Sequence, residues 1–328
     1  MKALDRKLAA IAAGTYTPDQ FVLADAKDAD MAWGLRAAGE VPGAPGTYRT
    51  RQEYLDAMVD EIRAEAVDIV LTSVSNGERL VREDVFEDSA VTLAVRANDT
   101  TDIWGPRGGH YASRPSRPFR TADLARARQL CSLALYSVTF NNDLDHDLET
   151  LERYAAFRSE AQAVGMRHFL EVFNPNAPVD LAPEDVGGFV NDHIVRLLAG
   201  VAQVERPLFL KIAYNGPEAL AELASHDPSL VVGVLGGSAG TTRDTLELLA
   251  QAERHGARVA LFGRKVQHAE SQLDLLASMR AVVGGRETPE AAVAAYHETL
   301  QRKGIEPRRP LADDQRITEP VLAAGADG

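Results

Sequence analysis

The chain has 328 residues, enough for one large α/β barrel or two ordinary domains. Its 45% hydrophobic and 25% charged composition is typical of a soluble globular protein. A formal net charge of −13 argues against a nucleic-acid or anionic membrane partner, and no apolar stretch is long enough to span a membrane. The single cysteine, Cys131, excludes an internal disulfide and fits a reducing compartment, so we expect a cytoplasmic protein.

Short apolar, β-branched runs alternate along the chain with longer segments of helical periodicity. The predicted strands span residues 21–24, 67–72, 91–96, 133–139, 168–173, 208–213, 230–234 and 259–262. The predicted helices between and after them span residues 51–66, 77–87, 121–130, 145–164, 183–200, 216–225, 241–255 and 267–283. Eight repeats of an apolar strand followed by a helix are typical of a (β/α)8 TIM barrel.

An additional helix is predicted at each end, over residues 1–13 and 289–303, and residues 323–328 are predicted to form a frayed tail. No linker interrupts the alternation, which favours a single TIM-barrel domain over residues 1–328. Residues 1–20 would then be an N-terminal helical extension, and 289–328 a C-terminal helix and tail. A long segment, 98–120, follows the third strand and is rich in arginine, and such loops often carry substrate-binding groups in barrel enzymes.

Polar residues stand at or just after the carboxyl ends of the predicted strands, where a barrel places its active site. Each Ser, Asn or Asp among them could instead cap a helix or a turn. The predicted substrate-binding residues are Asp25, Lys27, Ser73, Arg96, Asn98 and Asn141.

Lys211 lies within the apolar run PLFLKIA of the sixth predicted strand and is one of only six lysines. A buried ammonium group costs several kcal/mol unless it is paired or neutralised. A desolvated lysine can lose its proton, and the free amine attacks carbonyl groups to form a Schiff base. The alternative is a strand-end lysine whose amine reaches solvent. We predict that Lys211 is a catalytic nucleophile.

Glu171 lies within a second apolar strand, HFLEVF, where an unpaired carboxylate would be costly. We therefore predict that Glu171 is the counter-charge and proton shuttle of Lys211. Tyr214, which follows the sixth strand, is the alternative proton carrier.

Two turns are predicted to bind a phosphate group. The glycine-rich turn GGSAG follows the seventh strand and opens a helix, and GRK follows the eighth. The alternative is a tight turn next to a surface Arg-Lys pair. The predicted phosphate-binding residues are Gly236, Gly237, Ser238, Gly240, Arg264 and Lys265.

The eight histidines show no HxH or HExxH spacing, so we predict no metal centre. The aspartate-rich end of the first strand could nevertheless hold Mg²⁺.

Together these motifs resemble the class I, Schiff-base aldolases of the barrel superfamily that includes deoxyribose-phosphate, archaeal-type fructose-bisphosphate and tagatose-bisphosphate aldolases. LFLKIA places Lys211 where that family has its Schiff-base lysine, on the sixth strand. FLEVF is similar to a segment of tagatose-bisphosphate aldolases whose glutamate is implicated in proton transfer, which corresponds to Glu171. GRKVQ is similar to the phosphate-binding GRN turn of archaeal-type aldolases, and GGSAG fills the strand-seven phosphate position.

The resemblance implies a cofactor-free lyase of carbohydrate metabolism that acts on a small phosphorylated sugar, and we expect a homo-oligomer. The fourth strand lacks a lysine that relatives often carry, so the acid–base groups near Thr139 and Asn141 are expected to differ. The alternatives are a metal-dependent barrel lyase or aldolase and a non-catalytic barrel that binds a phosphorylated metabolite.

Overall fold

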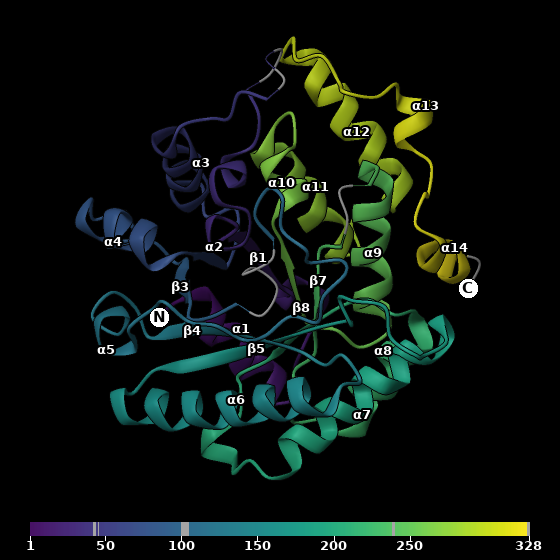
Figure 1. Ribbon diagram of the computed structural model, residues 1–328. Coiled ribbons are helices and arrows are strands. Elements are labelled where there is room, and N and C mark those ends of the chain that lie inside the picture. The colour runs from purple at the N-terminus through teal and green to yellow at the C-terminus, as the bar shows by residue number, and fades with distance from the viewer. Residues whose placement is uncertain (42–43, 45, 100–104, 238–239, 327–328) are drawn as a thin grey trace.

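Eight parallel strands form a closed barrel in the order β1 to β8, as the computed structural model shows (Figure 1). The structure describes residues 1–41, 44, 46–99, 105–237 and 240–326. The strands are β1 (Val22–Lys27), β2 (Ile69–Thr72), β3 (Thr92–Arg96), β4 (Leu133–Thr139), β5 (Arg167–Phe173), β6 (Leu210–Ile212), β7 (Gly233–Leu235) and β8 (Val259–Phe262). The predicted TIM barrel is confirmed.

Helices follow the strands and form the outer layer of the barrel. Those after β1 to β4 are α2 (Asp30–Trp33), α3 (Arg51–Arg63), α4 (Val74–Arg82), α5 (Leu124–Ala127) and α6 (Leu144–Val164). Those after β5 to β8 are α7 (Val186–Ala199), α8 (Pro217–His226), α9 (Thr242–Arg254), α10 (Arg264–Gln267) and α11 (Gln272–Val283). None of these helices, nor any other described helix, is both long and apolar enough to span a bilayer.

Helices are also present at both ends of the chain: α1 (Ala3–Ala12), α12 (Pro289–Arg302), α13 (Leu311–Asp314) and α14 (Pro320–Ala326). The predicted terminal helices are thus confirmed, but the predicted frayed tail is wrong over residues 323–326, which belong to α14. This helix forms because Leu322 packs in the outer core and its carbonyl accepts a hydrogen bond from Gln251 of α9 (2.8 Å).

Side chains alternate along each strand between the barrel interior and the helical layer outside it. The interior cluster contains Phe169 of β5 and Phe209, which immediately precedes β6. Two residues further along, Glu171 and Lys211 therefore face the interior as well, and they are register neighbours across β5 and β6. The interior apolar residues are Leu4, Val22, Ala24, Ile69, Leu71, Ala94, Leu133, Leu135, Phe169, Phe209, Val259 and Leu261.

The structure differs from the prediction at two places near the barrel mouth. Strand β1 continues to Lys27, three residues beyond its predicted end, because residues 24–27 pair in register with β2. The helix predicted over residues 267–283 begins only at Gln272, as α11, and a break separates it from the short helix α10, which ends at Gln267. The side chains of Gln267 and Gln272, on either side of this break, both accept hydrogen bonds from Lys27.

The C-terminal segment runs alongside α9 and is fastened to it by Asp244 (Figure 1). The Asp244 carboxylate accepts hydrogen bonds from the backbone N–H of Thr241 (2.9 Å) and from the N–H and hydroxyl of Thr318 (2.7 and 2.5 Å). Burial raises the pKa of Asp244, but the bonds from Thr318 and from backbone N–H groups outweigh this and lower it. Asp244 therefore contributes stability as a carboxylate, and this contribution is lost as the pH falls through its lowered pKa.

We expect Asp244→Ala to lower the free energy of unfolding by about 1.5–3 kcal/mol, since hydrogen bonds to a charged group are lost. The segment after residue 314 should also become more susceptible to limited proteolysis. Urea unfolding at pH 7 and trypsin digestion measure the two effects. Asp313→Ala, which removes an exposed carboxylate from the same segment, is the matched control and should change neither. Equal digestion rates in the two variants would contradict the role given to Asp244.

Candidate active site

A cavity of about 330 Å³ lies at the carboxyl end of the barrel. Its wall includes Lys211 and Glu171 from β6 and β5, Arg96 from β3, and the loop residue Tyr111. The remaining lining residues are Ala26, Asp28, Ala29, Ala32, Trp33, Asp99, Phe173, Leu235, Gly236, Gly237, Leu261, Gly263 and Arg264. The cavity therefore lies where active sites of TIM-barrel enzymes are found.

Lys211 and Glu171 form a buried ion pair, with 2.5 Å between Nζ and Oε1. The other carboxylate oxygen of Glu171 accepts hydrogen bonds from Arg96 Nη2 (3.0 Å) and Ser137 Oγ (2.7 Å). Burial raises the pKa of Glu171, but the positive charges of Lys211 and Arg96 outweigh this and hold it below its ordinary value. Glu171 is therefore an ionised counter-charge to two cations.

Arg96 connects this pair to two further carboxylates. Its guanidinium contacts Asp28 (2.5 Å) and Asp99 (2.6 Å) as well as Glu171, and its Nε donates to the carbonyl of Asn98 (2.9 Å). Asn98 in turn exchanges two hydrogen bonds with the backbone of Ser137 on β4. Both predicted substrate-binding residues thus have internal partners: Arg96 lines the cavity within an ion network, whereas Asn98 joins β3 to β4.

The predicted position of Asp25 and Lys27 in the site is wrong, because both lie within β1 and face outward. Lys27 is completely buried between the barrel and its helices. Its Nζ contacts Asp25 (2.9 Å) and Glu61 of α3 (3.1 Å), together with the amide oxygens of Gln267 and Gln272 (2.8 Å each). Burial lowers the pKa of Lys27, but the two carboxylates outweigh this and raise it. Lys27 is therefore a fixed cation of the barrel wall.

Three other predicted residues also lie away from the cavity lining. The hydroxyl of Ser73 donates to Asp30 (2.6 Å), and the side-chain oxygen of Asn141 accepts from the N–H of Asn176 (3.2 Å). Tyr214 follows β6 on its outer side, packs against the outer core and donates to Gln251 of α9 (2.7 Å). The structure does not bring Tyr214 to Lys211, so the alternative proton carrier is in the wrong place.

The predicted phosphate turns are only partly in the cavity. Gly236, Gly237 and Arg264 line it, and Arg264 donates to the carbonyl of Gly237 (2.9 Å). A Cβ atom at position 236 would lie 2.5 Å from the ring of Phe262, so glycine is required where this backbone approaches β8. Ser238 lies outside the described residues.

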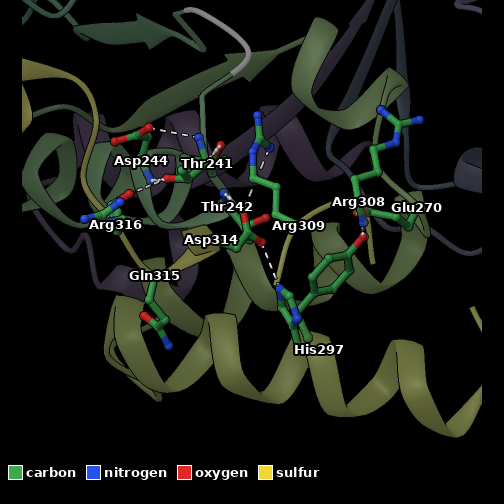
Figure 2. Close-up of polar contacts among 12 residues, drawn as sticks. Thr241, Thr242, Asp244, Glu270, His297, Arg308, Arg309, Asp314, Gln315 and Arg316 are labelled. Carbon is green, nitrogen blue, oxygen red and sulfur yellow. Dashed lines mark hydrogen bonds and ion pairs between the residues drawn. The ribbon is translucent and has the colours of Figure 1, made fainter. Parts of the chain in front are cut away.

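Lys265 and Gly240 lie on the far side of this turn. Lys265 donates to the carbonyl of Gly240 (3.0 Å) and lines a separate cavity with Arg308 and Arg309. At the start of α9 the N–H of Thr242 donates to Asp314 of the C-terminal segment (2.8 Å), as Figure 2 shows. The structure thus places Gly240 and Lys265 outside the lining of the Lys211 cavity, and a carboxylate of the chain itself occupies this end of α9.

The aspartates at the end of β1 do not converge on one point. Asp25 contacts Lys27, Asp28 contacts Arg96, and Asp30 accepts from Ser73. Within residues 1–41, 44, 46–99, 105–237 and 240–326, no group of three or more His, Cys, Asp or Glu side chains is arranged to hold a metal ion.

Sequence reasoning missed Tyr111, although it identified the loop that carries it. The loop arginines face outward, where Arg117 and Arg120 pair with Glu149 and Glu160 of α6. The aromatic residue that precedes them in the loop, in GGHYASRP, is the one that reaches the cavity. The available signal was an aromatic side chain within a Gly- and Pro-rich loop that follows a barrel strand.

Comparison with solved structures identifies barrels of the same architecture. An archaeal fructose 1,6-bisphosphate aldolase is 17% identical and has a TM-score of 0.61, with 86% of this chain and 99% of that chain covered. A Schiff-base-forming fructose-1,6-bisphosphate aldolase is 16% identical and has a TM-score of 0.61, with 85% and 99% covered. The chain shares the fold of these class I aldolases.

A protein of Corynebacterium glutamicum is also similar, at 17% identity and a TM-score of 0.58, with 87% of this chain and 98% of that chain covered. No protein-family model and no curated protein sequence matches the chain. The predicted resemblance is thus confirmed in the fold, since identities this low say nothing about substrate.

Lys27 should be needed for the stability of the barrel wall. We expect Lys27→Met to lower the free energy of unfolding by about 3–5 kcal/mol, because it leaves Asp25 and Glu61 without their cation. Urea unfolding measures this, with Lys303→Met, at an exposed ion pair, as the control that should cost at most about 1 kcal/mol. A Lys27→Met protein as stable as wild type would show that Lys27 does not hold the barrel wall together.

Proposed function

We propose that the protein is a class I aldolase that cleaves or forms a carbon–carbon bond in a phosphorylated sugar through a Schiff base on Lys211. The observation that carries the proposal is the pairing of Lys211 with Glu171 in a cavity that also contains Gly236, Gly237 and Arg264. The fold shared with Schiff-base-forming aldolase supports it. A single-domain organisation, a homo-oligomeric state and a cytoplasmic location remain predictions.

The chemistry begins with Lys211. Its Nζ must lose a proton before the nitrogen can attack a carbonyl carbon, and Glu171 Oε1 is an acceptor within hydrogen-bond distance. Loss of water from the resulting carbinolamine gives an iminium, which withdraws electrons from the bond that breaks. Arg96 and Ser137 hold the other oxygen of Glu171, so Oε1 keeps its orientation toward Nζ.

A phosphate group would bind at the part of the cavity wall formed by the turns after β7 and β8. Gly236 and Gly237 bring backbone close to the ligand, and Arg264 contributes a positive charge. An anchor remote from the carbonyl supplies binding energy that orients the reacting carbon against Lys211.

Lys211→Arg should fold normally but lose activity, because a guanidinium stays protonated and cannot form an imine. Borohydride reduction in the presence of dihydroxyacetone phosphate should add the ligand covalently to wild type and not to Lys211→Arg, as read by intact mass. Lys265→Arg is the matched control and should still be trapped. Substantial turnover by Lys211→Arg would overturn the Schiff-base proposal. Activity that is lost on chelation and restored by Mg²⁺ or Zn²⁺ would favour a metal-dependent lyase instead.

Arg264→Ala should weaken the use of phosphorylated substrates specifically. A lost charged contact costs about 1.5–3 kcal/mol, which corresponds to a decrease of about 10- to 150-fold in kcat/KM. Kinetics with a phosphorylated substrate and its unphosphorylated analogue measure this, and the analogue should be affected far less. Lys265→Ala, which changes the next residue of the same turn, should show no phosphate-specific loss. An equal loss for both substrates in Arg264→Ala would assign Arg264 a structural role.

A further inference from the structure

The Schiff-base chemistry proposed above needs a group that both donates and accepts protons at the substrate carbons. Glu171 is poorly suited to donate, since its carboxylate is bound by Lys211, Arg96 and Ser137. Burial raises the pKa of Glu171, but the charges of the two cations outweigh this and lower it. Asp28 and Asp99 are both paired with Arg96. The carboxylates that line the described part of the cavity are therefore all committed to ion pairs.

Tyr111 is the one phenol among the described residues that line this cavity. Its ring packs edge-to-face against Trp33 of α2, with 6.4 Å between the ring centroids. No described residue forms a hydrogen bond with its hydroxyl, which leaves that group available to a ligand. Tyr111 thus faces the same space as Lys211 but comes from a different part of the chain.

The loop that carries Tyr111 is held over the barrel mouth by Asn176, which follows β5. The side-chain amide of Asn176 donates to the carbonyls of Tyr111 (2.5 Å) and Arg114 (2.8 Å), and its oxygen accepts from the N–H of Ser116 (3.0 Å). At its base the loop is joined by paired backbone hydrogen bonds between Asp99 and Phe119. The position of the phenol is therefore fixed by the strand that carries Glu171.

The surroundings of the phenol keep it protonated before substrate binds. Burial, followed by the negative charges of Asp99 and Glu171, raises the pKa of Tyr111 to about 12, against the opposing charge of Arg264. At neutral pH Tyr111 is a proton donor. Once an iminium has formed on Lys211, its positive charge stabilises a phenolate in the same cavity.

We propose that Tyr111 is a catalytic residue that carries protons between the substrate and the Lys211 Schiff base; this rests on the proposed function. Tyr111 gives its proton to the hydroxyl of the carbinolamine, which leaves as water and yields the iminium. The phenolate then takes the proton of the substrate hydroxyl next to the bond that breaks. The carbon that bears this hydroxyl becomes the carbonyl carbon of an aldehyde. The electrons of the broken carbon–carbon bond move toward the iminium nitrogen and give an enamine.

The second half of the cycle restores the phenol. Tyr111 donates its proton to the enamine carbon, and the new phenolate takes a proton from the water that adds to the second iminium. Two protons are given and two are taken, so Tyr111 begins and ends the cycle as a neutral phenol. The resulting carbinolamine is still bound to Lys211, and cleavage of its C–N bond gives the ketone product and free Lys211.

Deuterium exchange separates proton transfer from Schiff-base formation. Wild type incubated with dihydroxyacetone phosphate in D₂O should exchange hydrogen at the hydroxymethyl carbon, because the iminium loses and regains a proton there. Tyr111→Phe should still give the borohydride adduct when incubated to equilibrium, while exchange falls by about 10²- to 10⁴-fold. Tyr16→Phe is the matched control, since the hydroxyl of Tyr16 bonds Glu253 on another part of the surface, and its exchange should equal that of wild type.

The outcomes distinguish the two proposals. Absence of an adduct in wild type would overturn the Schiff-base function and, with it, the role of Tyr111. Adducts in wild type and Tyr111→Phe with equal exchange rates would overturn only the role of Tyr111. Loss of the equilibrium adduct in a Tyr111→Phe protein of unchanged melting temperature would show that Tyr111 binds substrate and does not transfer protons.

A second variant keeps the phenol but releases its loop. Asn176→Ala removes the amide that holds the carbonyls of Tyr111 and Arg114. We expect exchange to fall at least about tenfold while the adduct still forms, since misplacing a catalytic group lowers its rate. Exchange at the wild-type rate in Asn176→Ala would contradict the positioning role given to this residue.

Discussion

The carboxylate of Glu171 is the interaction on which the barrel mouth depends. It offsets the buried ammonium of Lys211 through one oxygen and binds Arg96 and Ser137 through the other. Without this carboxylate, the buried charges of Lys211 and Arg96 would lack their shared counter-charge. The free-energy cost of burying both cations is offset only by close, well-oriented pairing. Because Arg96 is also paired with Asp28 and Asp99, a single connected network joins the ends of β1, β3, β4, β5 and β6. Residues of five strands, or of the loops that follow them, therefore contribute to the orientation of Lys211.

Two buried lysines on opposite sides of the barrel wall show how environment decides chemistry. Lys27 has two carboxylates and two amide oxygens as partners and no access to the cavity, so it remains a structural cation with a pKa raised by Asp25 and Glu61 despite burial. Among the described residues, Lys211 has a single carboxylate partner, which it shares with Arg96, and it lines a space large enough for a small ligand. Only the second arrangement leaves an amine on the wall of a cavity.

The C-terminal segment limits what the turn after β7 can do. Asp314 accepts hydrogen bonds from Thr242 at the start of α9 and from His297 of α12, as Figure 2 shows. This carboxylate occupies a helix end that would otherwise attract an external anion. The phosphate site that we propose therefore uses the side of the turn formed by Gly236, Gly237 and Arg264, within the cavity of Lys211.

The sequence by itself determined the barrel and the facing of Lys211 and Glu171, because apolar strands of alternating orientation place residues of matching register on the same side. It could not determine where each strand ends. A continuation of β1 by three residues turned Asp25 and Lys27 outward, and Tyr214 took the outer side of β6. Only the tertiary structure brought Asp314 to α9, and Asn176 to the loop of Tyr111 across 65 residues of chain. Such contacts join side chains that are far apart in the sequence and adjacent only in the folded barrel, so no local sequence pattern predicts them.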